Sequence, residues 1–191
     1  MSDNQPLPQL PCVRVQFTRI AEAQTHPEGQ GVSYCASGYV FLGKLELVGA
    51  DGSLLSELEV QTGGWMSTDS PFARQKLCPP NPTWGSYVPQ EYPDTAFPLL
   101  SEPTVLGTLR TGRLRGFRVP DPPGTGRSWL MVHDSTRRGS EGCITTPPGE
   151  LWEAFCAYMA QWHAEGRESI PLTVSYTCAP PNPLRCPHAA S

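Results

Sequence analysis

Proline and glycine occur throughout the chain, at 22 and 18 of its 191 residues. Both residue types interrupt helices, because proline lacks a backbone N–H and glycine loses the most backbone entropy on ordering. Together they make up about a fifth of the chain, which disfavours a helical bundle. The length is sufficient for one domain with a packed core and short for two.

Alternating apolar and polar side chains predict strands, because a half-buried strand has one apolar face. The segment 13–20 alternates in this way. Residues 38–62 are typical of a meander, with strands over 39–42, 44–48 and 54–60 and an Asp-Gly turn at 49–53. Further strands are expected over 105–119, 128–133 and 170–176. We therefore predict a mainly β fold.

One principal helix is predicted near the C-terminus. Thr146 is the expected N-cap, Pro147 the first helical residue and Gly166 the residue that closes the helix. A stripe of large side chains recurs between them at helical spacing and is expected in the core. Its members are Leu151, Trp152, Phe155, Cys156, Met159 and Trp162.

The chain divides into an arm, one domain and a tail. Residues 1–11 are expected to form a flexible N-terminal arm, 12–177 a single catalytic domain, and 178–191 a Pro-rich tail. Within the domain, 63–104 is dense in glycine, proline and aromatic residues. We expect it to form a long ordered loop.

The charge and hydropathy of the chain exclude several classes of protein. A net charge of −4 disfavours a nucleic-acid binder or a polybasic membrane-surface protein. No apolar run is long enough for membrane insertion, and residues 1–12 lack the features of a secretory signal. We expect synthesis in the cytoplasm.

The chain has seven cysteines, an odd number, so any disulfide pairing leaves at least one thiol. This count suggests an oxidising destination with one cysteine reserved for chemistry. Cys178, Cys186 and His188 are candidate metal ligands, but no tight Cys-x-x-Cys pair accompanies them. A disulfide, or no special role for these residues, is the favoured interpretation, and no metal site is predicted.

His133 and Cys143 form the pair that indicates chemistry. A thiol is a strong nucleophile only as the thiolate, and a nearby imidazole can take its proton. Ten positions of extended chain would separate the two residues by about 33 Å, so the chain must reverse between them. Residues 134–142 are small and polar with two glycines, which suits a reversal. The alternative is a structural cysteine and an unrelated histidine.

Residues around Cys143 have predicted supporting roles. Gly142 permits a positive φ, and its N–H with that of Cys143 is expected to stabilise an oxyanion. Ser140 is expected to bond the turn backbone or to orient the thiol. Arg137 and Arg138 are candidates for binding substrate carboxylates. A second basic stripe, either a solvated face or a further anchor, comprises Arg110, Arg113, Arg115 and Arg118.

The sequence Gly-Ser-Glu-Gly-Cys-Ile at 139–144, preceded by His133, resembles the signature of the L,D-transpeptidases. It is most similar to the branch of toxins delivered by type VI secretion, although Asp134 and Ser135 replace two glycines after the histidine. Thr62-Gly63-Gly64 is similar to a Tyr-Ser-Gly segment of that family, and 170–176 to its last strand.

The resemblance implies an L,D-transpeptidase-like β-sandwich and a cysteine enzyme that acts on peptidoglycan stem tetrapeptides. Cys143 would attack the carbonyl at the L-centre of the diamino acid, D-Ala would leave, and His133 would be the base. Water, a free D-amino acid or a second stem would accept the acyl group, and no cofactor would be needed. An antibacterial effector acting in a target cell's periplasm is implied, with secretion machinery and an immunity protein as partners.

Two alternatives belong to other classes. One is a different Cys–His peptidoglycan hydrolase, an amidase or an endopeptidase. The other is a non-enzymatic phage-tail or secretion-associated binding module in which Cys143 is structural. Selective alkylation of Cys143 would distinguish an enzyme from a binding module.

Overall fold

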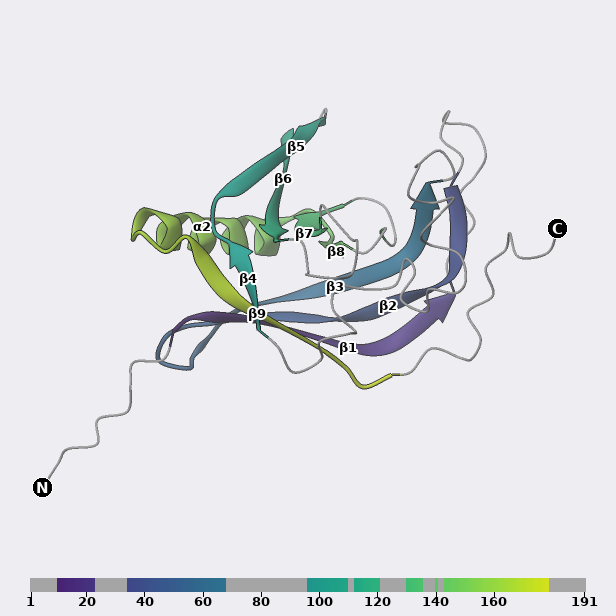
Figure 1. Cartoon of the computed structure of the whole chain (residues 1–191), viewed down its shortest axis with the longest axis horizontal. Coiled ribbons are helices and arrows are strands. Elements are labelled where there is room, and N and C mark those ends of the chain that lie inside the picture. Colours follow the sequence, from purple (N-terminus) through teal and green to yellow (C-terminus); the bar gives the residue numbers. More distant parts are fainter. Residues whose placement is uncertain are drawn as a thin grey trace, which may run out of the picture.

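The computed structural model describes residues 10–22, 34–67, 96–109, 112–120, 130–135, 140 and 143–178. Within these residues nine strands form one hydrogen-bonded sheet, in the order β4-β9-β1-β2-β3-β8-β7-β6-β5, and one helix packs against it (Figure 1). The prediction of a mainly β fold with one principal helix is confirmed.

The elements follow one another along the chain as strands, with the helix before the last strand. They are β1 (Cys12–Glu22), β2 (Tyr34–Val48), β3 (Leu54–Ser67), β4 (Phe97–Leu100), β5 (Pro103–Leu109), β6 (Gly112–Val119), β7 (Leu130–Asp134), β8 (Ile144–Thr146), α2 (Glu150–Ala164) and β9 (Ser169–Tyr176). The β1–β9 and β7–β8 pairs are parallel, and the other neighbouring strands are antiparallel.

Strands β2 and β3 form a long hairpin around the predicted Asp-Gly turn. The Asp51 carboxylate accepts the Ser53 N–H at 3.0 Å, and Gly52 has a φ of 82°. The hairpin is longer than predicted, because β2 continues through Gly43 without a break. A Cβ at Gly43 would lie 2.0 Å from the Gln16 carbonyl oxygen, so this position needs a glycine for β1 to approach.

The predicted loop over 63–104 is wrong at both ends. Strand β3 runs on to Ser67, β4 pairs with β9, and β5 begins at Pro103. Because β4 is an edge strand of this sheet, Pro98 is tolerated within it although it lacks an N–H. Residues 68–95, and nearly all of the predicted arm and tail, lie outside the described residues.

Helix α2 begins later than predicted. Its N-cap is Gly149, not Thr146. Thr146 instead ends β8, where it pairs with Asp134 and its carbonyl accepts the Ser135 N–H at 2.8 Å. The predicted end is confirmed, because Gly166 has a φ of 83°.

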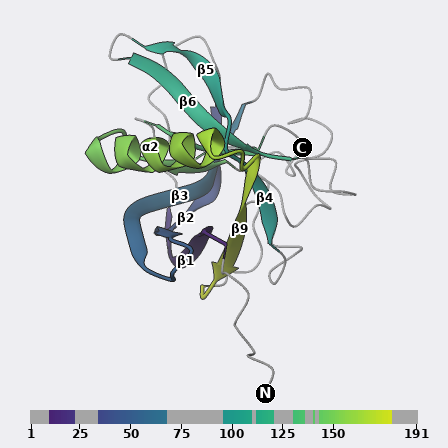
Figure 2. The same cartoon turned by 90° about the vertical axis from the view of Figure 1, so that its left-hand side faces the viewer.

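The apolar face of α2 packs into the concave side of the sheet. Figure 2 shows the helix between the β5–β6 hairpin and the curled part of the sheet formed by β1, β2 and β3. Phe117 of β6 contacts Trp152 and Phe155, with ring centroids 5.9 and 5.5 Å apart. All predicted members of the stripe are buried except Leu151, which is 60% exposed because it lies beyond the edge of the buried arc in the first turn.

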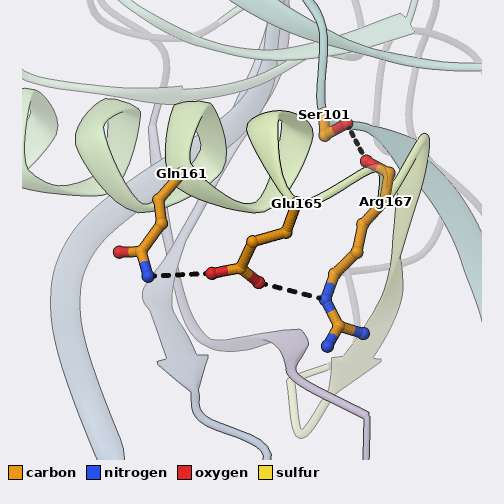
Figure 3. A network of polar contacts seen from close by, with 4 residues as sticks. All are labelled: Ser101, Gln161, Glu165 and Arg167. Carbon is orange, nitrogen blue, oxygen red and sulfur yellow. Dashed lines mark hydrogen bonds and ion pairs between the residues drawn. The ribbon is translucent and has the colours of Figure 1, made fainter.

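The C-terminus of α2 is tied to the β4–β5 turn by a polar network (Figure 3). The buried Ser101 hydroxyl donates to the Arg167 carbonyl, and Glu165 contacts both Gln161 and Arg167. His163 Nδ1 lies 3.1 Å from Ser101 Oγ. Because the single hydroxyl proton is already donated, His163 must donate to Ser101, so this exposed histidine fastens the helix end.

Candidate functional site

Parallel strands β7 and β8 place the predicted pair close together. Val132 pairs with Ile144, and His133 pairs with Thr145. Val132 and Ile144 are fully buried in the core, so His133 and Thr145 lie on the other face of the sheet. The chain therefore does reverse between the two predicted residues, through a nine-residue crossover over 135–143.

Cys143 immediately precedes β8 and is partly buried. It stands two positions before Thr145, so an extended chain places it on the same face as His133. With a strand spacing of about 4.8 Å and a rise of about 3.3 Å per residue, ideal strand geometry gives a separation of about 8 Å between the Cα atoms of His133 and Cys143. At this separation the two side chains are within reach of each other.

Ser140 fixes the crossover against strand β3. Its N–H donates to the Gly63 carbonyl at 2.8 Å, and its hydroxyl donates to the Cys143 carbonyl. Of the two roles predicted for Ser140, the structure shows bonding of the turn backbone. Since Gln61 pairs with Thr145, continuing the antiparallel register puts Gly63 opposite Cys143. Gly63 has a φ of 74° and belongs to the Thr-Gly-Gly segment that the resemblance singles out.

His133 is held in one tautomer. Its Nδ1 lies 2.7 Å from the carbonyl oxygen of Asp134. A carbonyl only accepts, so Nδ1 carries the proton and Nε2 presents a lone pair. Burial lowers the pKa of His133 below its ordinary value of 6.5. The imidazole is therefore neutral at pH 7 and able to take a proton at Nε2.

A cluster of ionisable side chains lies on the opposite face of β7, beneath α2. Arg115 forms an ion pair with Glu153 of the helix, and Asp134 and Cys156 interact electrostatically with both. Burial raises the pKa of Asp134, and it raises the pKa of Cys156 to about 12. Cys156 is therefore protonated at neutral pH and is no nucleophile.

The predicted basic stripe is split between the two faces of the sheet. Arg115 points to the helix side, where it pairs with Glu153. Gly116 pairs with His133 of β7, and paired residues share a face. Arg118 stands two positions after Gly116 on the same strand, so it lies on the face of His133. Several predicted residues lie outside the described part of the chain, among them Arg110, Arg137, Arg138, Gly142, Cys186 and His188.

A row of residues across five strands was not anticipated from the sequence. Arg19 pairs with Leu42, Leu42 with Gln61, Gln61 with Thr145, and Thr145 with His133. Paired residues of neighbouring strands share a face, so this row extends from the histidine to β1 on one side of the sheet. A single sequence does not show which residues of two strands pair with each other. The alternation of polar and apolar residues indicates only that each strand has one polar face.

Within the described residues, no group of three or more His, Cys, Asp or Glu side chains is placed to hold a metal. In the same part of the chain, no helix is both long and apolar enough to cross a membrane. Comparison with protein-family models, with curated protein sequences and with solved structures gives no match. The chemistry of the site is therefore argued from its residues and their geometry.

Proposed function

We propose that this protein is a cysteine peptidase and acyltransferase of the L,D-transpeptidase type that acts on peptidoglycan stem tetrapeptides. The observation that carries the proposal is the hydrogen bond from His133 Nδ1 to the Asp134 carbonyl, 2.7 Å long. It leaves Nε2 as the proton acceptor on the strand beside Cys143. The motif around Cys143 supplies the substrate class, and the sheet is the proposed sandwich scaffold.

The proposed reaction has two acyl-transfer steps. Cys143 Sγ attacks the carbonyl carbon at the L-centre of the diamino acid while His133 Nε2 takes the thiol proton. The tetrahedral intermediate expels the amine of the terminal D-Ala, which receives that proton, and a thioester remains. Water or a free D-amino acid then attacks the thioester, His133 takes its proton, and the thiol reforms.

Two further roles belong to the proposal. The N–H groups of Gly142 and Cys143 would stabilise the oxyanion, and Arg137 and Arg138 would bind stem carboxylates. The hydroxyl of Ser140 holds the Cys143 carbonyl, which supports a fixed backbone at the nucleophile.

The proposed biological role is that of an antibacterial effector. Removing or exchanging the terminal D-Ala would deprive a target cell of stems for cross-linking. The protein would be made in the producer's cytoplasm and act in the target's periplasm. An immunity protein and type VI secretion machinery would then be its partners.

The test is to incubate the protein with disaccharide-tetrapeptide, with and without a D-amino acid, and to identify the products by mass spectrometry. Loss or exchange of D-Ala is expected, with none from the Cys143→Ala variant and normal activity from the Cys156→Ala variant. Cleavage between sugar and peptide, or within the stem, would replace the proposal by the amidase or endopeptidase alternative. Unchanged substrate together with slow alkylation of Cys143 would favour a binding module.

A further inference from the structure

A pocket of about 270 Å³ lies next to β8, between strands β1, β2 and β3. The residues that line it include Arg19, Leu42, Glu59, Gln61 and Pro147. The volume is just below the range of about 300–1,000 Å³ for sites of drug-sized ligands, so the pocket suits a group the size of one amino acid.

The pocket is on the face of the sheet that carries His133. Arg19, Leu42 and Gln61 belong to the row that continues through Thr145 to His133. Glu59 stands two positions from Gln61, and Pro147 two positions after Thr145, so the alternation of side chains places both on this face. Strands β8 and β2 are two strand spacings apart, which is about 10 Å. Gln61, which pairs with Thr145 of β8, and Pro147, which follows β8, place one wall of the pocket beside the strand that begins after Cys143.

The pocket has one side chain of each charge. Arg19 and Glu59 are exposed, and neither forms an ion pair with any other residue that the structure describes. Lys44, which lies opposite Glu59 in the strand pairing, forms its ion pair with Glu57 at 2.6 Å and interacts with Glu59 only through a weaker electrostatic attraction. Arg19 and Glu59 thus remain available to a ligand with both charges.

The backbone at Gly43 lies unusually close to the neighbouring strand β1. Gly43 lines the pocket, at the point where β1 bulges between Phe17 and Arg19. A Cβ at Gly43 would clash with the backbone of β1, at 2.0 Å from the Gln16 carbonyl oxygen. This position therefore requires a glycine, and β1 and β2 lie close together where they line the pocket.

We propose that this pocket binds a zwitterionic α-amino acid group, with its carboxylate on Arg19 and its ammonium on Glu59. The guanidinium suits a carboxylate because it offers two parallel N–H donors. The proposal rests on the proposed function, under which such a group has two sources. It is either the free end of a diamino acid side chain in the stem or a free D-amino acid that accepts the acyl group.

Binding to the Cys143→Ala protein tests the pocket without catalysis. We expect meso-diaminopimelate and D-alanine to bind by calorimetric titration, and 1,5-diaminopentane and glutarate, which carry charges of one sign, not to bind. Arg19→Gln and Glu59→Gln should each weaken binding at least tenfold. Arg14→Gln, an exposed arginine of the same strand, is the matched control and should not. Equal binding of one-sign probes, unchanged binding by the pocket variants, or no binding of the zwitterions would overturn the proposal.

Two arms with the active protein distinguish the sources. If the pocket holds the stem, tetrapeptides with diaminopimelate will be processed with a higher kcat/KM than those with lysine, and Arg19→Gln will remove the difference. If it holds the acceptor, the two stems will react equally, and Arg19→Gln will raise the KM for D-alanine in exchange. Zwitterion binding without processing of any stem would support the pocket and contradict the proposed function.

Discussion

His133 donates its Nδ1 proton to the backbone carbonyl of Asp134, its own neighbour in the chain, across 2.7 Å. The Asp134 side chain points to the other face of β7, toward α2 and the Arg115–Glu153 pair. A backbone oxygen, not a carboxylate, therefore orients the imidazole. Burial has the largest effect on the pKa of His133 and lowers it, although the Asp134 carbonyl and the charge of the Asp134 carboxylate both favour the protonated ring.

The first prediction concerns pH and activity. The pKa of His133 is lowered below 6.5, and only the neutral ring can take the thiol proton. The acid limb of kcat/KM should therefore have its midpoint below pH 6.5, with activity retained at pH 6.5–7.5. His133→Gln should lower kcat by about 10²–10⁴-fold. His163→Gln, which removes a histidine at the helix end, should leave the midpoint unchanged; an acid midpoint above pH 7 would contradict this interpretation of the site.

The same residue makes a prediction about stability. The unfolded chain takes up a proton on this histidine near pH 6.5, whereas the folded site does so only at lower pH. The unfolded state binds more protons in this window, so the free energy of unfolding should fall as the pH drops below 6.5 and level off once the folded pKa is passed. Urea titrations from pH 7 to 5 measure the slope. The His133→Gln variant should show a smaller change in the free energy of unfolding with pH. An equal change in the variant would show that other groups cause the pH dependence.

Thiol labelling separates Cys143 from the buried cysteine of α2. Burial raises the pKa of Cys156 to about 12, so almost none of it is thiolate at pH 7.5. Burial also raises the pKa of Cys178. We expect iodoacetamide to label Cys143 fastest, with peptide mass spectrometry as the readout. The His133→Gln variant should slow this labelling, and equal rates at Cys143 and Cys156 would contradict the assigned nucleophile.

Local sequence patterns predicted the features that depend on residues close to one another in the chain. The alternation over 13–20, the Asp-Gly turn and the helix end at Gly166 each depend on residues within a few positions. Thr146 shows the limit of such patterns. It has the chemistry of an N-cap, but pairing with Asp134 draws it into β8, and this partner lies twelve positions away in the chain.

Only part of the candidate site was accessible from the sequence. The His133 and Cys143 pair was found because both lie on one short, glycine-rich segment. The row from Arg19 to His133 was not found, because it depends on the register of four strand pairs. The orientation of the imidazole was equally hidden, because its partner is a backbone carbonyl that no residue type signals.

The last prediction separates the position of Cys143 from the integrity of the fold. Ser140→Ala removes the hydroxyl that donates to the Cys143 carbonyl but keeps the N–H bond to Gly63. Loss of one such bond should cost about 1 kcal/mol of stability. It should also lower kcat by about tenfold or more with little change in KM, because the nucleophile is held less firmly. Ser175→Ala is the stability control and should keep full kcat, because the Ser175 hydroxyl bonds the Val15 carbonyl between strands β9 and β1, which are not neighbours of β8 in the sheet. Wild-type kcat in Ser140→Ala would show that this hydroxyl does not position Cys143.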